Sequence, residues 1–258
     1  MADQHPPQLA LDIGNTTTKA AVWQNGVLGE VLTWPTGEDW RPADDLVTNL
    51  GVQNIIFSTV ANVPPPAWRD KRKAAGQLVV GLREGLPLPF TSRYRTMATL
   101  GQDRIAAVAG GLWLRPDPAP APPPPLLIAD AGTCLTLDLI DSNRVYHGGN
   151  ISPGLRMRLW AMYELTARLP LISEGNPAGL VGDSTSEALR HGAQRGLVYE
   201  VEGLYQRLRA QYPDLQLYLT GGDGPFLHAQ LSVPCVFNPN LVLLGLHYIL
   251  SDYVRIKS

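Results

Sequence analysis

Two short apolar runs along the chain each end in an acidic residue, which is followed by a glycine, a threonine and a second run of strand character. The first of these stretches covers residues 9–23, and the second covers residues 126–140. Apolar and β-branched residues on both sides of a glycine turn are typical of a tight hairpin. The pattern therefore predicts one strand-turn-strand unit in each half of the chain.

The polar residues at these two turns have the chemistry of a phosphate site. The first turn carries Asp12, Gly14, Asn15 and Thr16, and the second carries Asp130, Gly132 and Thr133. A glycine lets the backbone approach a ligand, backbone N–H groups and threonine hydroxyls can hold phosphate oxygens, and a carboxylate can hold a cation. One such turn is most often a plain hairpin, whereas two turns across one cleft would clamp a polyphosphate and its metal ion.

The rest of the pattern alternates between strands and helices. It predicts helices over residues 42–50, 68–82, 102–114, 155–169, 183–211 and 241–256, and strands over residues 17–24, 27–34, 54–60, 216–220 and 233–237. The proline-rich residues 115–125 can be neither helix nor inner strand, so we expect an extended spacer there. The expected organisation is an N-terminal lobe over residues 1–115, a connector over residues 116–125 and a C-terminal lobe over residues 126–258.

Two further stretches have ambiguous chemistry. Asp103 falls in the first turn of a predicted helix, where it is either a helix cap or a functional acid, and the helix dipole should keep it ionised. Its neighbour Arg104 is disfavoured at that end of a helix, which suggests an anionic ligand. The basic residues of the predicted helix over residues 68–82, which include Arg72, are expected to form a solvated face.

Composition narrows the class of protein further. The 258 residues are 45% hydrophobic and 17% charged, and the net charge of −2 gives no electrostatic case for nucleic-acid binding. The two cysteines, Cys134 and Cys235, are too few for a disulfide framework and suit the cytosol, although a bond between them stays open. The first residues lack the features of a signal peptide, and no apolar run reaches the length of a membrane span. We therefore expect a soluble cytoplasmic protein that binds no membrane.

Taken together, the ordered motifs resemble the type III pantothenate kinase family, which belongs to the acetate and sugar kinase, Hsp70 and actin superfamily. The matching stretches are DIGNTTTK from Asp12, LGQDR from Leu100, DAGT from Asp130, GGNISPG from Gly148, TARLP from Thr166, GDST from Gly182, TGGD from Thr220 and the closing helix from Leu241 to Leu246. The resemblance covers nearly the whole chain. The chain departs from the family pattern at Met97, where proline is frequent, at Cys134, where alanine is usual, and in the length of the proline connector.

The resemblance implies an α/β fold: a two-lobed actin-like ATPase fold in which each lobe is an RNase H-like mixed sheet flanked by helices. It implies the transfer of phosphate from ATP to pantothenate, which gives 4′-phosphopantothenate in the first step of coenzyme A biosynthesis. It also implies a homodimer, for which the apolar helix after Gly154 would suit an interface.

By the same resemblance, each motif residue has an expected role. The residues expected to hold ATP and its Mg²⁺ are Asp12, Gly14, Asn15, Thr16, Lys19 and Thr133. Asp130 is expected to bind a monovalent cation, K⁺ or NH₄⁺. Asp103 is the expected general base, and the expected pantothenate contacts are Tyr94, Gly101, Gln102, Asp103, Arg104 and Thr185.

Two alternatives come from other classes of protein. One is a sugar or acyl kinase of the same superfamily, which the LGQDR and GGNISPG stretches together disfavour. The other is a non-catalytic accessory transcription regulator on the same fold, which would be expected to lack Asp12, Asp103 or Thr133. All three residues are present in this chain.

Overall fold

The chain forms two compact units. The computed structural model describes residues 6–37, 39–60, 64–83, 85–115, 122–176 and 179–257. One unit consists of Met1–Asp117 together with Asn240–Ser258, and the other consists of Pro118–Pro239. The closing helix thus belongs to the first unit, whereas we expected it in the C-terminal lobe; the boundary at residue 126 otherwise lies close to the division.

The first unit is built on a mixed sheet. Its strands are β1 (Gln8–Ile13), β2 (Thr17–Gln24), β3 (Val27–Leu28), β4 (Leu32–Pro35), β5 (Asn54–Thr59) and β6 (Leu78–Gly81). They follow the order β3-β2-β1-β5-β6, and β4 pairs with β2. β1 is antiparallel to β2 and parallel to β5, so the predicted hairpin after the first apolar run is confirmed.

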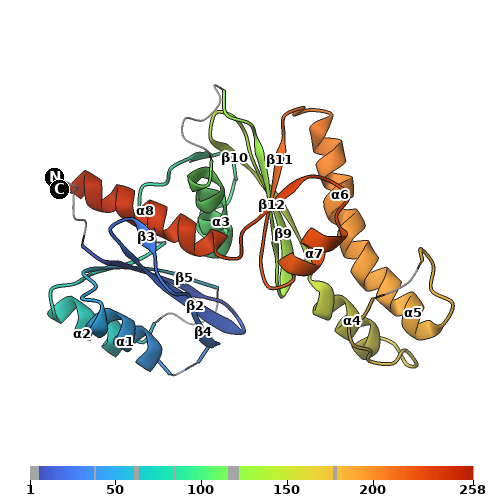
Figure 1. The fold of residues 1–258 in the computed structure, drawn as a ribbon, viewed down its shortest axis with the longest axis horizontal. Helices are drawn as coiled ribbons and strands as arrows, with labels where there is room; N and C mark the ends of the chain where they lie inside the picture. Colours follow the sequence, from blue (N-terminus) through green and yellow to red (C-terminus); the bar gives the residue numbers. More distant parts are fainter. Residues whose placement is uncertain are drawn as a thin grey trace. The chain divides into compact units, whose positions relative to one another are not determined.

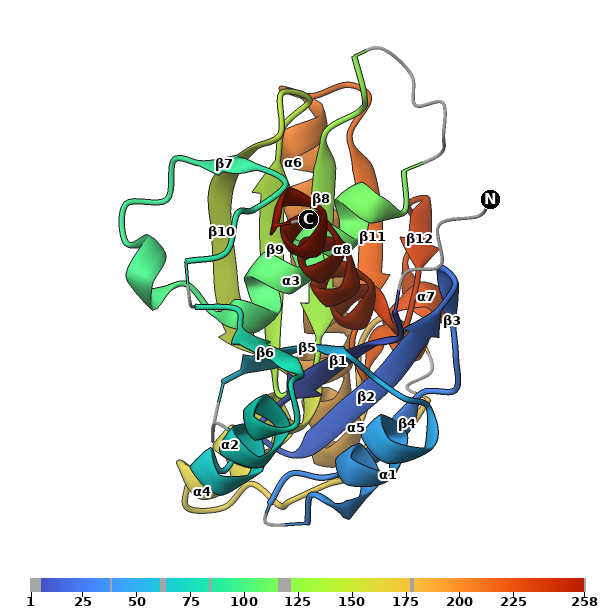
Figure 2. The same cartoon turned by 90° about the vertical axis from the view of Figure 1, so that its left-hand side faces the viewer.

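Helices cover both faces of this sheet (Figure 2). α1 (Arg41–Asn49) and α2 (Pro66–Ala74) lie on one face, where alternate residues of β1, β2 and β5 form an apolar core with them. α3 (Gln102–Trp113) and α8 (Leu241–Lys257) lie on the other face, and a two-residue strand β7 (Thr91–Ser92) and a 3₁₀ turn η1 (Met97–Thr99) precede α3. Because side chains alternate along a strand, the residues of β1 that do not face α1 point toward α3 and α8.

The close crossing of α3 and α8 explains why α8 belongs to the first unit. A Cβ added at Gly110 would lie 2.0 Å from the carbonyl oxygen of Leu241, and one added at Gly245 would lie 1.8 Å from that of Ala106. The two helices therefore touch backbone to backbone at these glycines. No larger residue fits at either position without moving a helix.

The helix predicted over residues 68–82 is wrong in its second half. α2 ends at Ala74, Gly76 takes a φ of 83°, and the apolar run that follows becomes β6, which pairs in parallel with β5. Arg72 does not lie on a solvated face, because it is buried against the ring of Trp68 and forms an ion pair with Asp44. A buried cation is tolerated when it is paired in this way.

The second unit is also built on a mixed sheet, drawn edge-on in Figure 1, and its strands follow the order β12-β11-β8-β9-β10 (Figure 2). Its strands are β8 (Leu126–Ala131), β9 (Cys134–Ile140), β10 (Val145–Pro153), β11 (Gln216–Thr220) and β12 (Cys235–Phe237). Its helical segments are α4 (Leu155–Glu164), α5 (Thr185–Arg190), a π-helical turn η2 (His191–Arg195), α6 (Gly196–Arg209) and α7 (Gly224–Gln230). The helix predicted over residues 183–211 is therefore confirmed apart from its ends, whereas the one predicted from residue 155 stops at Glu164.

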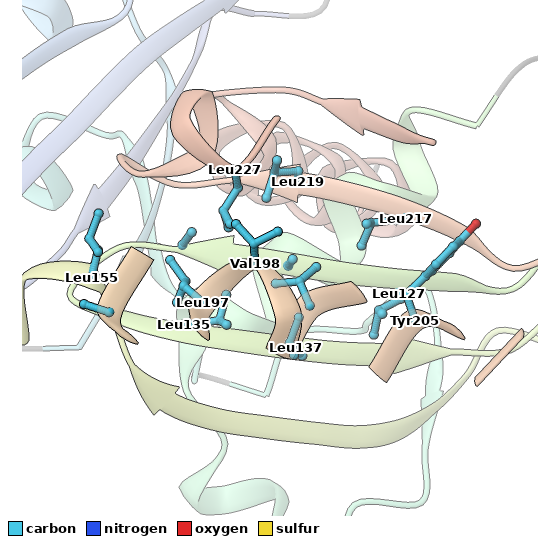
Figure 3. Close-up of a cluster of buried hydrophobic side chains, with 14 of the residues drawn as sticks. Leu127, Leu135, Leu137, Leu155, Leu197, Val198, Tyr205, Leu217, Leu219 and Leu227 are labelled. Atoms are coloured by element: carbon cyan, nitrogen blue, oxygen red, sulfur yellow. The ribbon is translucent and has the colours of Figure 1, made fainter. Parts of the chain in front are cut away.

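One face of this second sheet carries the core of the unit (Figure 3). Leu127 and Leu137 on the sheet are buried in one cluster with Leu197, Val198 and Tyr205 of α6. Alternation along β8 then points Asp130 to the opposite face. Cys134 and Cys235 are both free thiols, and among the helices that the structure describes none is long and apolar enough to cross a membrane.

Candidate active site in two half-sites

The first half-site is built around Asp12, at the end of β1. Asp12 lies opposite Lys19 on β2 and opposite Ser58 on β5, and all three therefore share the face of the sheet that carries α3 and α8. The hydroxyl of the buried Ser58 donates a 2.8 Å hydrogen bond to Oδ1 of Asp12. The pairing of three strands thus brings a carboxylate, a cation and a hydroxyl to one place.

Burial makes Asp12 a carboxyl group that titrates near neutral pH. Desolvation raises the pKa of Asp12 to about 6, which outweighs the lowering by the Ser58 hydrogen bond and by Lys19. The negative charge of Asp103 raises the pKa of Asp12 as well. The two predicted functional acids of this unit are therefore close enough to interact electrostatically.

The turn after Asp12 is held by hydrogen bonds on both sides. The N–H of Gly14 donates to the carbonyl oxygen of Thr17 at 3.0 Å, which closes the turn. The Thr36 hydroxyl donates to the carbonyl oxygen of Gly14 at 2.9 Å, and the Thr36 N–H donates to the carbonyl oxygen of Thr16 at 3.0 Å. Asn15 and Thr16 stay exposed at the tip. A fixed turn with an exposed tip is suited to binding phosphate oxygens through its backbone.

Asp103 lies in the first turn of α3. Its carboxylate accepts a 2.8 Å hydrogen bond from the N–H of Arg104, so it does contribute to capping the helix. Desolvation nevertheless raises the pKa of Asp103 above the usual range for an aspartate, and the lowering by Arg104 is the smaller effect. Burial thus outweighs the neighbouring cation, and the pKa of Asp103 is raised and not lowered. A raised pKa makes Asp103 a stronger base once it is ionised.

The residues around Asp103 combine an aromatic ring with a buried cation. The guanidinium of Arg104 lies 5.9 Å from the centre of the Tyr94 ring, and Arg104 is only 4% exposed. Gly101 is the residue before α3, and a Cβ there would lie 2.4 Å from Oδ1 of Asp103. The structure thus brings Tyr94, Gly101, Asp103 and Arg104 together.

Gln102, for which we predict a contact with pantothenate, also makes a structural contact within the first unit. It is buried, and its Oε1 accepts a 3.0 Å hydrogen bond from the N–H of Thr59. Because Thr59 follows Ser58, this bond ties the start of α3 to the end of β5. It fixes Asp103 relative to Asp12 within the first unit.

The second half-site repeats the plan of the first around Asp130, at the end of β8. Asp130 lies opposite Thr136 on the antiparallel strand β9 and opposite Thr220 on the parallel strand β11. Asp12 likewise has one antiparallel and one parallel neighbour. The second turn is shorter by one residue, and the N–H of Gly132 donates to the carbonyl oxygen of Cys134 at 2.9 Å. Thr133 is exposed at its tip.

Two glycines let neighbouring segments approach this second turn closely. A Cβ at Gly154 would lie 2.0 Å from the carbonyl oxygen of Gly132, and the N–H of Gly154 donates to the carbonyl oxygen of Thr133 at 3.0 Å. A Cβ at Gly221, whose φ is 92°, would lie 2.2 Å from the carbonyl oxygen of Ala131 and 2.5 Å from Oδ1 of Asp130. The GGNISPG and TGGD stretches are thus packed directly against the predicted phosphate turn.

Several residues of the two half-sites were not predicted. Ser58 and Thr36 support the first turn, and Thr136 flanks Asp130. The motif spacing gives no sign of them, because they reach the site only through strand pairing. Thr185 begins α5 in the second unit and is exposed.

The donor atoms suit hard cations. Within the described ranges, no three His, Cys, Asp or Glu side chains converge as a metal cluster. Asp12 is a single carboxylate beside a phosphate-binding turn, which suits Mg²⁺ because that ion keeps several waters and takes oxygens from the substrate. Asp130 and the Ala131 carbonyl oxygen both approach Gly221, and such oxygens can hold a monovalent cation. The residues present therefore fit both ions.

Comparison with solved structures supports the class of the fold. A proposed Baf family transcriptional activator from Campylobacter jejuni aligns with a TM-score of 0.61 at 22% identity, over 96% of this chain and 99% of that one. A proposed N-acetylmannosamine kinase from Listeria monocytogenes aligns with a TM-score of 0.55 at 17% identity, over 95% and 99% of the two chains. These two likenesses, together with the two mixed sheets, place the chain in the class of proteins with an actin-like ATPase fold.

Sequence relatives identify the family within that class. A model of the type III pantothenate kinase family matches residues 8–207. A type III pantothenate kinase from Phocaeicola vulgatus is 36% identical over 244 residues, which cover 94% of this chain and 97% of that protein. One from Flavobacterium psychrophilum is 32% identical over 93% and 96% of the two chains. The chain belongs to the type III pantothenate kinase family, and the predicted family, fold class and kinase activity are confirmed.

Proposed function

We propose that this protein transfers the γ-phosphoryl group of ATP to the hydroxyl group of pantothenate, with Asp103 as the acceptor of the hydroxyl proton. The observation that carries the assignment of Asp103 is its place at the start of α3, beside Arg104 and Tyr94 and within electrostatic reach of Asp12. An acid, a buried cation and a ring next to a phosphate turn fit a small carboxylic acid that carries an alcohol.

In the reaction, the pantothenate hydroxyl oxygen forms a bond to the γ-phosphorus while the bond from that phosphorus to the bridging oxygen of ADP breaks. The hydroxyl proton passes to a carboxylate oxygen of Asp103. Phosphoryl transfer depends mainly on positioning and electrostatic stabilisation. The first unit supplies the positioning, because hydrogen bonds fix its turn and the bond from Thr59 to Gln102 fixes the start of α3.

The other residues of the first unit bind and orient. The backbone of Gly14, Asn15 and Thr16 and the side chain of Lys19 hold phosphate oxygens. Asp12 would hold Mg²⁺, which would supply positive charge to neutralise the phosphates. Arg104 binds the pantothenate carboxylate, since a guanidinium is a suitable partner for that group, and Tyr94 and Gly101 line the same place.

The second unit contributes contacts to the nucleotide and to a monovalent cation. Thr133 contacts ATP through its exposed hydroxyl, and Asp130 binds K⁺ or NH₄⁺ with help from the neighbouring backbone oxygens. The 221–224 turn binds the adenosine part. Thr185 contacts pantothenate, and we propose that the protein works as a homodimer in which exposed apolar residues of α4, such as Trp160 and Leu165, are covered.

Two other functions are less well supported. The Baf family name of the Campylobacter protein raises the possibility of a transcription regulator, but this chain retains Asp12, Asp103 and Thr133. The name of the Listeria protein suggests sugar kinase activity as an alternative function, but the match to that protein is a likeness of fold at 17% identity.

An ATP-consumption assay tests the proposal. The purified protein is incubated with ATP, Mg²⁺ and K⁺, and with either pantothenate or one of a panel of sugars and acyl acids. We expect ADP formation that depends on pantothenate, with 4′-phosphopantothenate identified by mass spectrometry. ADP formation with a sugar and none with pantothenate would overturn the proposal.

A further inference from the structure

The 221–224 turn is joined to the rest of the second half-site by one buried carboxylate, that of Asp223. The Asp223 side chain is 8% exposed, and its Oδ1 lies 3.3 Å from a guanidinium nitrogen of Arg156. It also accepts a hydrogen bond from the N–H of Leu155, the first residue of α4. The carboxylate therefore links the turn to the start of α4.

The backbone of the same residue reaches the second phosphate turn. The N–H of Asp223 donates a 2.8 Å hydrogen bond to the carbonyl oxygen of Ala131, which follows Asp130. Gly154, which precedes α4, is hydrogen-bonded to Thr133 in that turn. Asp223 is thus the point at which the proposed adenosine turn, the predicted phosphate turn and α4 are held together.

Arg156 links the Asp223 carboxylate to a second acidic residue, Glu174. Its Nε donates a 3.0 Å hydrogen bond to Glu174, and its other end reaches Asp223. The Arg156 side chain is 78% exposed, whereas the Asp223 carboxylate is buried. A buried carboxylate is costly unless it is paired, and an amide could accept the Leu155 hydrogen bond without that cost. The charge of Asp223 therefore needs a reason other than capping a helix.

We propose that Asp223 is a positioning residue that, together with Arg156, holds the 221–224 turn in the geometry that binds the nucleotide. This inference rests on the proposed function only in assigning the turn to the adenosine part of ATP. Asp223 acts through the turn and does not touch the reacting atoms. Its loss should therefore weaken nucleotide binding and leave the pantothenate residues of the first unit unaffected.

The test compares Asp223→Asn and Arg156→Gln with matched controls. Asp141→Asn is the control for Asp223, because Asp141 also accepts backbone N–H groups at a turn of the second unit. Arg255→Gln is the control for Arg156, because Arg255 is an equally exposed arginine that pairs with Asp252. The readouts are the Kd for ADP by calorimetry, the KM values for ATP and pantothenate, kcat, and the melting temperature.

We expect Asp223→Asn to raise the Kd for ADP and the KM for ATP about tenfold, the usual size of a lost charged hydrogen bond. The KM for pantothenate should stay unchanged. Arg156→Gln should have a smaller effect of the same kind, and combining the two changes should add little, because both act through one ion pair. Neither control should change the Kd for ADP.

Two results would overturn the inference. One is an Asp223→Asn protein with the wild-type Kd for ADP. The other is a loss of pantothenate and nucleotide affinity in equal measure, which a general structural defect would produce. If Asp223→Asn does not fold, Arg156→Gln decides alone, since its exposed side chain can be replaced safely, and an unchanged Kd for ADP in it rejects the proposal. ADP binding does not depend on pantothenate, so wild-type protein that binds ADP but leaves pantothenate unphosphorylated would reject the proposed function and not this inference.

Discussion

The hydroxyl of Ser58 donates a 2.8 Å hydrogen bond to the carboxylate of Asp12, across the parallel pairing of β5 with β1. This bond lowers the pKa of Asp12, yet desolvation is the larger effect and the pKa is about 6. The group predicted to orient Mg²⁺ therefore changes its charge close to neutral pH. Three measurable consequences follow from this hydrogen bond and this pKa.

The pH dependence of the reaction should report the titration of Asp12. The carboxylate is ionised above a pH of about 6 and neutral below it. Since the ionised form is the one proposed to orient the metal ion, kcat/KM for ATP should fall by about tenfold per pH unit on the acid side of this value. A bound metal ion favours the ionised form, so the acid limb of kcat should lie at lower pH. Rates measured from pH 5 to 9 test this prediction, and a kcat/KM for ATP that stays constant down to pH 5 would contradict it.

Replacing Asp12 with asparagine should stabilise the protein at pH 7 while it removes activity. The folded pKa of about 6 is higher than the usual value of 3.8, so the folded state binds more protons than the unfolded state between these values. The free energy of unfolding therefore falls as the pH rises through this window, and it remains lower at any higher pH. Asp12→Asn should raise the free energy of unfolding by on the order of 1–3 kcal/mol at pH 7.

The gain in stability should become much smaller at pH 4, because Asp12 is then protonated in the folded state and partly protonated in the unfolded state. Urea denaturation of the wild-type protein and of Asp12→Asn at pH 7 and pH 4 measures the difference. A variant that is less stable than the wild type at pH 7 would show that the buried, ionised carboxylate of Asp12 does not destabilise the folded protein.

Ser58→Ala tests the hydrogen bond itself. Its loss should raise the pKa of Asp12 further, so the acid limb of kcat/KM should move to higher pH. Ser251→Ala is the matched control, because Ser251 donates a hydrogen bond to Gln8 in the same unit and touches neither functional acid. The control should leave the pH profile unchanged, and an equal shift in both variants would reject a specific role for Ser58.

Asp130→Asn should remove the dependence on a monovalent cation. Wild-type rates are compared in sodium-only buffer and after addition of K⁺ or NH₄⁺. We expect stimulation in the wild type, because carboxylate and carbonyl oxygens converge near Gly221, and little stimulation in the variant. Equal wild-type rates in the two buffers would reject a cation site at Asp130.

The sequence predicted the elements that carry the motifs better than it predicted their surroundings. Both hairpins at Asp12 and Asp130 form where the apolar runs indicate, because a run of strand residues on each side of a glycine specifies them locally. The second half of the helix predicted over residues 68–82 is wrong, because the chain leaves the helix at Gly76, which has a positive φ, and the run that follows becomes β6 by pairing with β5.

The candidate site shows the same limit. Asp103 and Arg104 could be singled out, since an acid and a base at a helix start are visible in sequence. The raised pKa of Asp103 could not be predicted from the sequence, because the effect of burial outweighs the lowering by the neighbouring Arg104. Ser58 is 46 residues from Asp12 and meets it only through the strand register. Long-range pairing therefore decides both the support of the site and its electrostatics.

Arg104 and Asp103 should separate in their kinetic effects. Arg104→Ala should raise the KM for pantothenate through the loss of its carboxylate contact. Asp103→Asn should leave the KM for pantothenate largely unchanged. Steady-state kinetics with pantothenate as the varied substrate compare the two, and an Arg104→Ala protein with a wild-type KM would reject the carboxylate contact.

The turnover of Asp103→Asn tests the central claim most directly. Asparagine keeps the shape of the side chain but cannot accept the proton of the pantothenate hydroxyl. We predict a kcat lower by about 10²–10⁴-fold, the usual contribution of a general base, with a wild-type Kd for ADP and a wild-type melting temperature. A kcat close to that of the wild type would contradict the account and would leave Asp103 as a helix cap.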